Sequence, residues 1–248
     1  MPYNCRRLAR KKIKFLLHPP QAFSSLSSSL CASPSGIDEW PVAAQAGIFV
    51  ATYAGLAVGT WVGTTLLDRI SKFLVGLEQW RNNVIDTTLP FVMGTFFLLA
   101  GTGHFLAAEA FQDIYPPPGT WGFWYLPGSA AFHLIWTGVV EAVGGFGLLF
   151  SGVNNLLSRI RGDADNDNEL ELPFSLIQPL SALALFLLTV VVTPANIYMF
   201  THGAVLGDME PLNLSFHAIR FGVQVILLSL LLSLTKDSFF FVWGDTLD

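Results

Sequence analysis

Five long apolar segments constrain the fold of this 248-residue chain more than any other feature. We place them at residues 42–67, 90–109, 129–151, 174–199 and 213–234. A helix needs roughly 20 apolar residues to cross the hydrocarbon core of a bilayer. Only 12% of the residues are charged, against roughly 25% in a typical soluble domain. The sequence therefore predicts an all-α, polytopic transmembrane helix bundle whose main partner is a lipid bilayer.

The segments between these spans are polar or contain proline. Residues 70–83 are too short and too charged to cross a bilayer, and their apolar residues share one helix face. This pattern predicts a helix lying in the membrane interface. The acidic stretch "RIRGDADNDNELELP" resembles a calcium-binding loop. However, Asn168 stands where such a loop requires Gly, and Phe174 stands where it requires Glu. We therefore interpret this stretch as a solvated loop.

Residues 1–37 have the composition of a leader. Six of the thirteen Lys and Arg residues lie before residue 15, no acidic residue appears before Asp38, and the tract between is rich in serine. This is typical of an organellar transit peptide, and the serine content favours a plastid over a mitochondrion. The alternative is a disordered basic tail on an anionic membrane surface. Cleavage near residues 31–37 would remove both cysteines, Cys5 and Cys31. The mature protein would then have no thiol for disulfide exchange or for binding a metal.

The distribution of basic residues predicts the topology. Loops 68–89 and 152–173 and the C-terminus fall on one side and carry Arg69, Lys72, Arg81, Arg159, Arg161 and Lys236. The opposite loops, 109–128 and 200–212, carry no Lys or Arg. Because cytoplasmic loops are enriched in Lys and Arg, we expect the C-terminus on the cytoplasm-like side. Arg220 alone among the basic residues then lies inside the predicted membrane region.

Small residues recur every fourth position in the first span. They are Gly47, Ala51, Gly55, Gly59 and Gly63. Such a stripe lets two helices approach closely in lipid. We expect helix packing there, although Gly and Ala are also common in membrane helices.

Six polar residues of the predicted spans form the candidate site. They are His104, His133, Glu141, His217, Arg220 and Gln224. With a rise of about 1.5 Å per residue, the predicted topology places their histidines, together with His202, in one leaflet. Glu141 and Arg220 should face the bundle interior, because a lipid-facing charge costs about 2.5–3.5 kcal/mol. We expect a direct or water-bridged ion pair; the alternative is that the pair only holds two helices together.

The histidines raise the question of a metal centre. Two imidazoles on facing helices, such as His104 and His217 or His133 and His217, could ligate a b-type haem. No two histidines share a helix at metal-ligand spacing, and interfacial histidines are usually only hydrogen-bonded. We therefore expect neither haem nor a bound metal ion.

Five ordered motifs resemble those of DoxX-like integral membrane proteins. They are "FVMGTFFLLAGTGHF" (91–105), "YPPPG" (115–119), "WTGVVEAVGGFGLL" (136–149), "TPANIYMFTHG" (193–203) and "HAIRFGVQVILL" (217–228). The resemblance implies a four-helix membrane domain over residues 88–235. Residues 38–87 would then add one span and the interfacial helix, and residues 236–248 would form a short tail.

Two functions fit this sequence. The family is similar to the membrane subunit of a thiosulfate:quinone oxidoreductase, which favours a component of a quinone-linked redox complex. His104, His133 and Arg220 would then bind a quinone headgroup, and Glu141 would hold or relay a proton. The alternative is a non-catalytic assembly or scaffold subunit, whose small-residue stripe docks a partner helix or a second copy. A transporter is weaker, because no second half resembles the first. We expect no nucleic-acid partner.

Overall fold

The computed structural model describes residues 33–73, 87–161 and 176–244. Within these ranges the regular elements are helices, and five spans are long and apolar enough to cross a membrane. These spans are Val42–Ile70, Leu89–Leu106, Ala130–Arg161, Ile177–His202 and Leu214–Ser238. The expectation of an all-helical, multi-pass membrane bundle is therefore confirmed. The basic leader up to residue 32, the acidic loop and most of the predicted interfacial segment lie outside the described residues.

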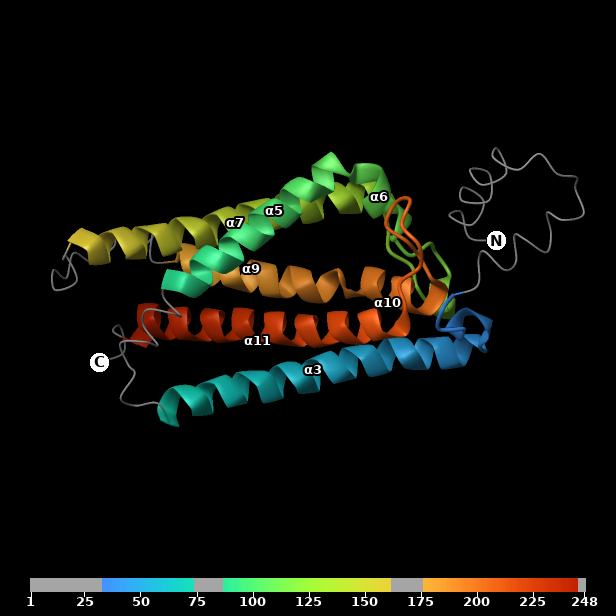
Figure 1. Ribbon diagram of the computed structural model, residues 1–248, viewed down its shortest axis with the longest axis horizontal. Helices are drawn as coiled ribbons and strands as arrows, with labels where there is room; N and C mark the ends of the chain where they lie inside the picture. The colour runs from blue at the N-terminus through green and yellow to red at the C-terminus, as the bar shows by residue number, and fades with distance from the viewer. Residues whose placement is uncertain (1–32, 74–86, 162–175, 245–248) are drawn as a thin grey trace, which may run out of the picture. The chain divides into compact units, whose positions relative to one another are not determined.

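Nine helical elements follow one another in the described chain (Figure 1). They are η1 (Ile37–Glu39), α3 (Val42–Phe73), α5 (Leu89–Leu106), α6 (Ala108–Asp113), η4 (Thr120–Gly122), α7 (Ala130–Arg161), α9 (Ile177–Val191), α10 (Thr193–His202) and α11 (Leu214–Gly244). Three of these helices, α3, α7 and α11, continue past their apolar segments. The bilayer limits apolar length, whereas the backbone hydrogen bonds of a helix continue through polar residues. In α7, Arg159 and Arg161 occupy the last turn, where a cation interacts favourably with the helix C-terminus.

Two of the predicted spans contain a break. The fourth span divides at Val192 into α9 and α10, two residues before Pro194. Proline lacks an N–H group and its ring clashes with the carbonyl of the residue four positions earlier, so it interrupts a helix at this point. The second predicted segment, 90–109, ends as α5 at Leu106, and Ala107 leaves helical geometry before α6 begins.

The described residues form two compact units. Unit 1 contains residues 33–55, 107–131 and 192–222, and unit 2 contains residues 56–73, 87–106, 132–161, 176–191 and 223–244. The helices α3 and α11 each contribute residues to both units.

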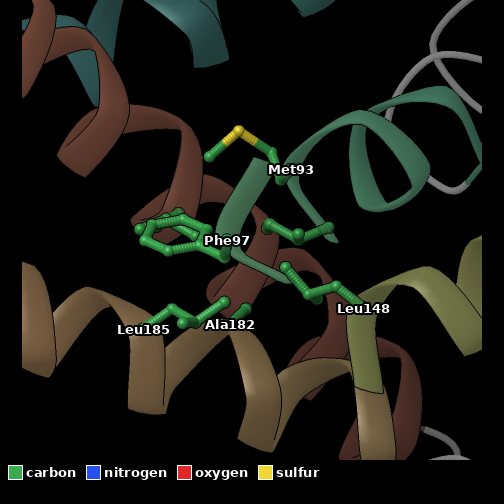
Figure 2. Close-up of a cluster of buried hydrophobic side chains, with 7 residues drawn as sticks. Met93, Phe97, Leu148, Ala182 and Leu185 are labelled. Carbon is green, nitrogen blue, oxygen red and sulfur yellow. The ribbon is translucent and has the colours of Figure 1, made fainter. Parts of the chain in front are cut away.

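Unit 2 is a helical bundle with an apolar core (Figure 1). Its helices are adjacent in the order α5, α7, α9, α11 and α3. Side chains from α5, α7, α9 and α11 meet in one buried cluster, five of which Figure 2 labels: Met93, Phe97, Leu148, Ala182 and Leu185. At the ends of α3 and α11, Lys236 donates to Asp68 at 3.0 Å. Unit 2 is thus held by apolar packing, with an ion pair at one end.

The closest helix contact in unit 2 joins α5 and α7. Glycine recurs every seventh residue on both helices, at Gly94 and Gly101 of α5 and at Gly138, Gly145 and Gly152 of α7. A Cβ atom at Gly101 would lie 2.5 Å from the backbone nitrogen of Ala142, and one at Gly145 would lie 2.5 Å from that of Leu98. The two backbones therefore touch, with no side chain between them. We call these five glycines the glycine seam.

The small-residue stripe predicted for the first span lies on α3. Three of its members face side chains of α11: Gly55 faces Phe221 in unit 1, while Gly59 and Gly63 face Val225 and Ser229 in unit 2. In contrast, a Cβ atom at Gly47 would contact nothing within 4 Å, and Ala51 is exposed. The stripe thus contacts α11 through its second half and is open in its first half.

Unit 1 has an aromatic core. Trp121, from the loop between α6 and α7, is 2% exposed and packs among side chains that include Phe49 and Tyr198. Its backbone adopts a φ of +55°, and its indole N–H donates to Thr201 Oγ1 at 3.1 Å. The proline-rich loop is therefore folded into this unit and is held there by a buried hydrogen bond.

Residues 33–37 also belong to unit 1, although they fall inside the predicted range of leader cleavage. The Ser35 hydroxyl donates to the carbonyl oxygen of Phe200 at 2.7 Å, near the end of α10. Ser33 and Ile37 are buried. Because the last carbonyl groups of a helix lack partners within the helix, the hydroxyl satisfies one of them.

We expect the glycine seam to be sensitive to a single methyl group. Gly101→Ala should destabilise the protein by about 1–3 kcal/mol, because the new Cβ would push the backbones of α5 and α7 apart. Gly103→Ala is the matched control on the same helix, since a Cβ atom there would contact nothing within 4 Å. That control should be neutral or stabilising, because Ala favours a helix over Gly by about 1 kcal/mol. Thermal unfolding in detergent measures both, and equal effects would contradict the close contact.

Candidate functional site

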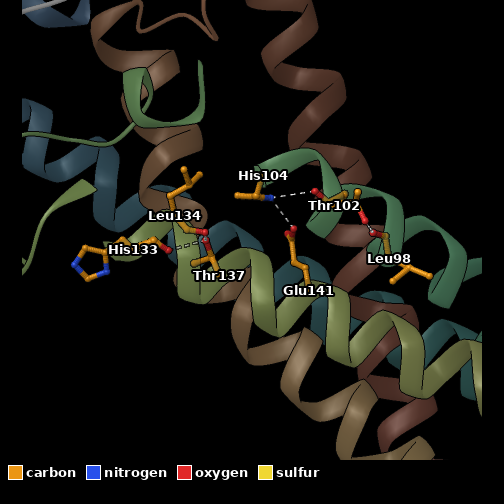
Figure 3. Close-up of polar contacts among 8 residues, drawn as sticks. Leu98, Thr102, His104, His133, Leu134, Thr137 and Glu141 are labelled. Carbon is orange, nitrogen blue, oxygen red and sulfur yellow. Dashed lines mark hydrogen bonds and ion pairs between the residues drawn. The ribbon is translucent and has the colours of Figure 1, made fainter. Parts of the chain in front are cut away.

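The glycine seam adjoins a polar pair, the half-buried His104 of α5 and the buried Glu141 of α7 (Figure 3). The Cβ atom of His104 lies beside Gly138, where a methyl group added to the glycine would approach it to 2.9 Å. Glu141 lies one turn after Gly138 on the same face of α7. Figure 3 shows the Glu141 side chain extending toward the imidazole ring. The absence of a side chain at Gly138 thus creates the space in which the two polar groups meet.

The Nδ1 atom of His104 has two oxygen neighbours. It lies 3.1 Å from the Ala100 carbonyl oxygen and 3.0 Å from Glu141 Oε2. Because a carbonyl oxygen can only accept a hydrogen bond, we assign a proton to Nδ1. The N–H points toward Ala100, so the contact with Glu141 is an ion-pair contact rather than an aligned hydrogen bond. With Nδ1 fixed in this way, Nε2 is the nitrogen at which His104 can gain or lose a proton.

Glu141 keeps an acceptor oxygen that no hydrogen bond uses. Its Oε2 atom is buried without a hydrogen-bond donor, and the side chains of His104 and Glu141 are only 14% and 12% exposed. The nearest donor to Oε2, the Nδ1–H group of His104, is shared with the Ala100 carbonyl oxygen, so Oε2 has only the ion-pair contact at 3.0 Å. A proton on Glu141, or a ligand that donates to it, would satisfy this oxygen more fully. The pair is therefore suited to holding and exchanging a proton.

Another polar contact of unit 2 lies at the level of this pair. Gln224 of α11 is buried, and its Nε2 donates to the Thr189 carbonyl oxygen of α9 at 3.4 Å. Gly144 of α7 faces Leu185 of α9. Glu141 lies one turn before Gly144 on α7, and Thr189 lies one turn after Leu185 on α9. Because the two helices are antiparallel, Glu141 and Thr189 lie at the same height along the bundle. Gln224 therefore belongs to the same layer of the bundle as Glu141.

His133 points away from the pair, as Figure 3 shows. Its Nδ1 accepts a hydrogen bond from the indole N–H of Trp136 at 2.9 Å, and its ring packs edge-on against Phe132. His133 thus makes local contacts on α7.

Arg220 and His217 belong to unit 1. The guanidinium of Arg220 donates to Asn196 Oδ1 and, at 3.1 Å, to the sulfur of Met199, both on α10. The His217 ring packs against Phe200 of α10 at 5.4 Å between ring centres. His202, at the end of α10, lies 2.7 Å from Thr201 Oγ1 through its Nδ1 atom. In the loop between α6 and η4, outside the membrane-spanning segments, burial raises the pKa of Tyr115, so this phenol stays protonated.

The six residues predicted as one site are distributed over both units. Unit 2 contains His104, His133, Glu141 and Gln224, and unit 1 contains His217 and Arg220. Within unit 2 the structure brings His104 and Glu141 together and leaves His133 aside. The predicted Glu141–Arg220 ion pair and the common leaflet of the histidines concern both units and stay predictions.

Several partners of these groups could not be found from sequence patterns. The carbonyl oxygens of Ala100 and Thr189 and the sulfur of Met199 accept hydrogen bonds from the site residues. Backbone carbonyls have no sequence signature. Asn196 did have a signal, because it follows the proline that breaks the fourth span. No three His, Cys, Asp or Glu side chains of the described ranges group closely enough to hold a metal ion.

Comparison with known proteins adds no relative. No family model, no curated protein and no solved structure matches the chain.

The contact between His104 and Glu141 can be measured by a double-mutant cycle. We expect His104→Gln and Glu141→Gln each to destabilise the protein, and the double variant to be more stable than the sum of the two effects predicts. The coupling should be on the order of 0.5–3 kcal/mol, as for side chains in contact. Unfolding in mixed micelles measures the free energy of unfolding of the wild type, the two single variants and the double variant. Additive effects, within about 0.5 kcal/mol, would show that the two groups do not interact.

Proposed function

We propose that this chain is a DoxX-like membrane component of a quinone-linked redox complex, in which His104 and Glu141 exchange protons with the quinone. The observation that carries the proposal is the contact between the half-buried imidazole of His104 and the buried carboxylate of Glu141 in a membrane-spanning bundle. Ionisable groups at membrane depth are costly, and they mark ligand sites and proton pathways more often than other residues do.

The packing of α5 against α7 argues against a purely structural role for the pair. Polar side chains can hold membrane helices together. Here, however, the backbones of the two helices already touch at Gly94, Gly101 and Gly145. Close packing of this kind supplies the attraction between helices in lipid. The pair is thus not needed to join α5 to α7, and a functional role accounts better for its cost.

The chemistry of a quinone matches what the pair can do. Reduction of a quinone to a quinol takes up two electrons and two protons. In the proposal, a redox partner subunit supplies the electrons. His104 delivers a proton from Nε2 to a quinone oxygen, and Glu141, which lies against Nδ1, stabilises the imidazolium before each transfer. Water then returns a proton to Nε2, and two such transfers supply the two protons of the quinol. General acid–base groups of this kind contribute about 10²–10⁴-fold to a reaction rate.

Sequence features support the family and the location in this proposal. The five motifs that resemble DoxX-like proteins include both His104 and Glu141. The composition of residues 1–37 favours an organellar membrane, with a plastid preferred. The predicted loss of both cysteines with the leader disfavours a thiol-based relay, which leaves a quinone as the redox partner of choice.

The proposal is tested on the full chain extracted gently into lipid nanodiscs from native membranes. We expect quinone to copurify with the wild-type protein and its complex. Glu141→Gln and His104→Gln should lower quinone turnover by about 10²-fold or more, because the proton exchange is lost. Glu109→Gln and His202→Gln are the controls, since they remove the same chemical groups outside the pair. Absence of quinone from the preparation, or equal turnover in all variants, would refute the proposal.

A second candidate, a scaffold subunit, is favoured by the open half of the stripe on α3. A Cβ atom at Gly47 would contact nothing within 4 Å, and the neighbouring Val50 is 63% exposed. A partner helix could approach closely at such a surface.

Gly47→Leu tests the scaffold candidate. As a scaffold, the protein should lose its complex in native gels, because the bulky side chain blocks the approach of the partner helix. The substitution should leave thermal stability unchanged, since Gly47 has open space in the chain itself. Gly59→Leu is a contrasting variant, because its side chain would collide with Val225 within the chain. Unchanged migration of Gly47→Leu would remove the main support for the scaffold.

A further inference from the structure

Arg220 is a cation whose partners within unit 1 are neutral. Its guanidinium donates to the amide oxygen of Asn196 and to the thioether of Met199. It is also the sole Lys or Arg among the described residues of unit 1. The described part of this unit therefore contains one permanent positive charge that no carboxylate of the unit neutralises.

The hydrogen-bonding capacity of Arg220 is only partly used. A guanidinium carries about five N–H donors, of which these two contacts use roughly two. Arg220 lies in the second turn of α11, roughly 9 Å from its start at Leu214. A charge at such a depth requires an anion or water to lower its cost. The remaining N–H groups could bind two oxygen atoms of one anion in the bidentate geometry that guanidinium favours.

The surface around Arg220 is apolar and open. Arg220 is itself half-buried against α10, whereas Phe216, one turn earlier on the same face, is 45% exposed. Ile219, the residue before Arg220, is 62% exposed. A ligand that reaches the guanidinium from the side of Phe216 and Ile219 therefore meets hydrocarbon next to the charge. An amphiphile with an anionic head satisfies both features, whereas a small free anion satisfies only the charge.

We propose that Arg220, supported by Asn196, binds the phosphate of an anionic phospholipid, whose acyl chains lie along the exposed apolar side chains of α11. Asn196 holds the guanidinium in place through its side-chain oxygen, and the other N–H groups of Arg220 face the phosphate. The site is separate from the proton exchange proposed for His104 and Glu141, and it does not depend on that function.

The test uses the delipidated full-length protein and native mass spectrometry, with phosphatidylglycerol as the probe. We expect Arg220→Gln to weaken phosphatidylglycerol binding by about tenfold, because a charge-assisted bidentate contact is lost. Arg220→Lys should weaken it less, since it keeps the charge but loses the planar fork. Arg69→Gln is the matched control, because it removes the same group from an exposed position on α3. Circular dichroism checks that each variant is folded.

Three outcomes would overturn the proposal. Equal weakening by Arg220→Gln and Arg69→Gln would mean that lipid responds only to overall charge. Displacement of the lipid by inorganic phosphate at comparable concentration would identify a site for free anions. Lipid binding that is unchanged in a folded Arg220→Gln variant would show that the guanidinium does not hold the phosphate. If Arg220→Gln does not fold, unchanged binding by Arg220→Lys together with competition by inorganic phosphate would also contradict a lipid site.

Discussion

The backbone contact between α5 and α7 is the constraint on which the arrangement of unit 2 depends. Lipid chains are as apolar as leucine, so burial of apolar surface gives membrane helices little reason to associate. Close packing must supply the attraction, and glycine allows the closest packing. Each glycine makes a helix less stable than alanine would by about 1 kcal/mol, so the five glycines of the seam lower the intrinsic stability of α5 and α7. In exchange they allow the two backbones to touch, and this contact places His104 opposite Glu141.

The sequence predicted the spans well because their signal is long and simple. The length of such an apolar run, about 20 residues, is set by bilayer thickness, and each predicted segment overlaps one of the five spans that are long and apolar enough to cross a membrane. The ends were harder to predict. The helices α7 and α11 continue for ten residues beyond residues 151 and 234, because hydrogen bonding along the backbone does not stop where the apolar residues stop. The break at Val192 had a signal in Pro194, but termination of the helix was equally compatible with it.

The packing partner of a helix could not be predicted from the pattern within that helix alone. A stripe of small residues indicates that close approach is possible, but it does not say which helix approaches. The stripe on α3 is in strict register, yet a Cβ atom at Gly47, at its start, would contact nothing within 4 Å. The seven-residue spacing of Gly94 and Gly101 matches that of Gly138 and Gly145 on another helix. Comparing the spacing between helices, rather than within one, would have predicted the seam.

For the polar groups, the residues themselves could be predicted but their partners could not. The positions of Glu141 and Arg220 within apolar helices could be predicted, because a charge in an apolar run is conspicuous. Their local partners could not, since a backbone carbonyl and a thioether have no charge to complement. Within its own unit, Glu141 lies against the imidazole of His104, and Arg220 lies against neutral Asn196 and Met199.

This difference in partners separates two kinds of chemistry. An imidazole and a carboxylate can each hold or release a proton, so the charge of the His104–Glu141 pair can change while both side chains stay in place. A guanidinium keeps its proton, and its charge can only be neutralised by an anion brought to it. The first arrangement suits a ligand that exchanges protons and leaves. The second suits a ligand with a permanent negative charge that stays bound, which is why we assign the two groups to different ligands.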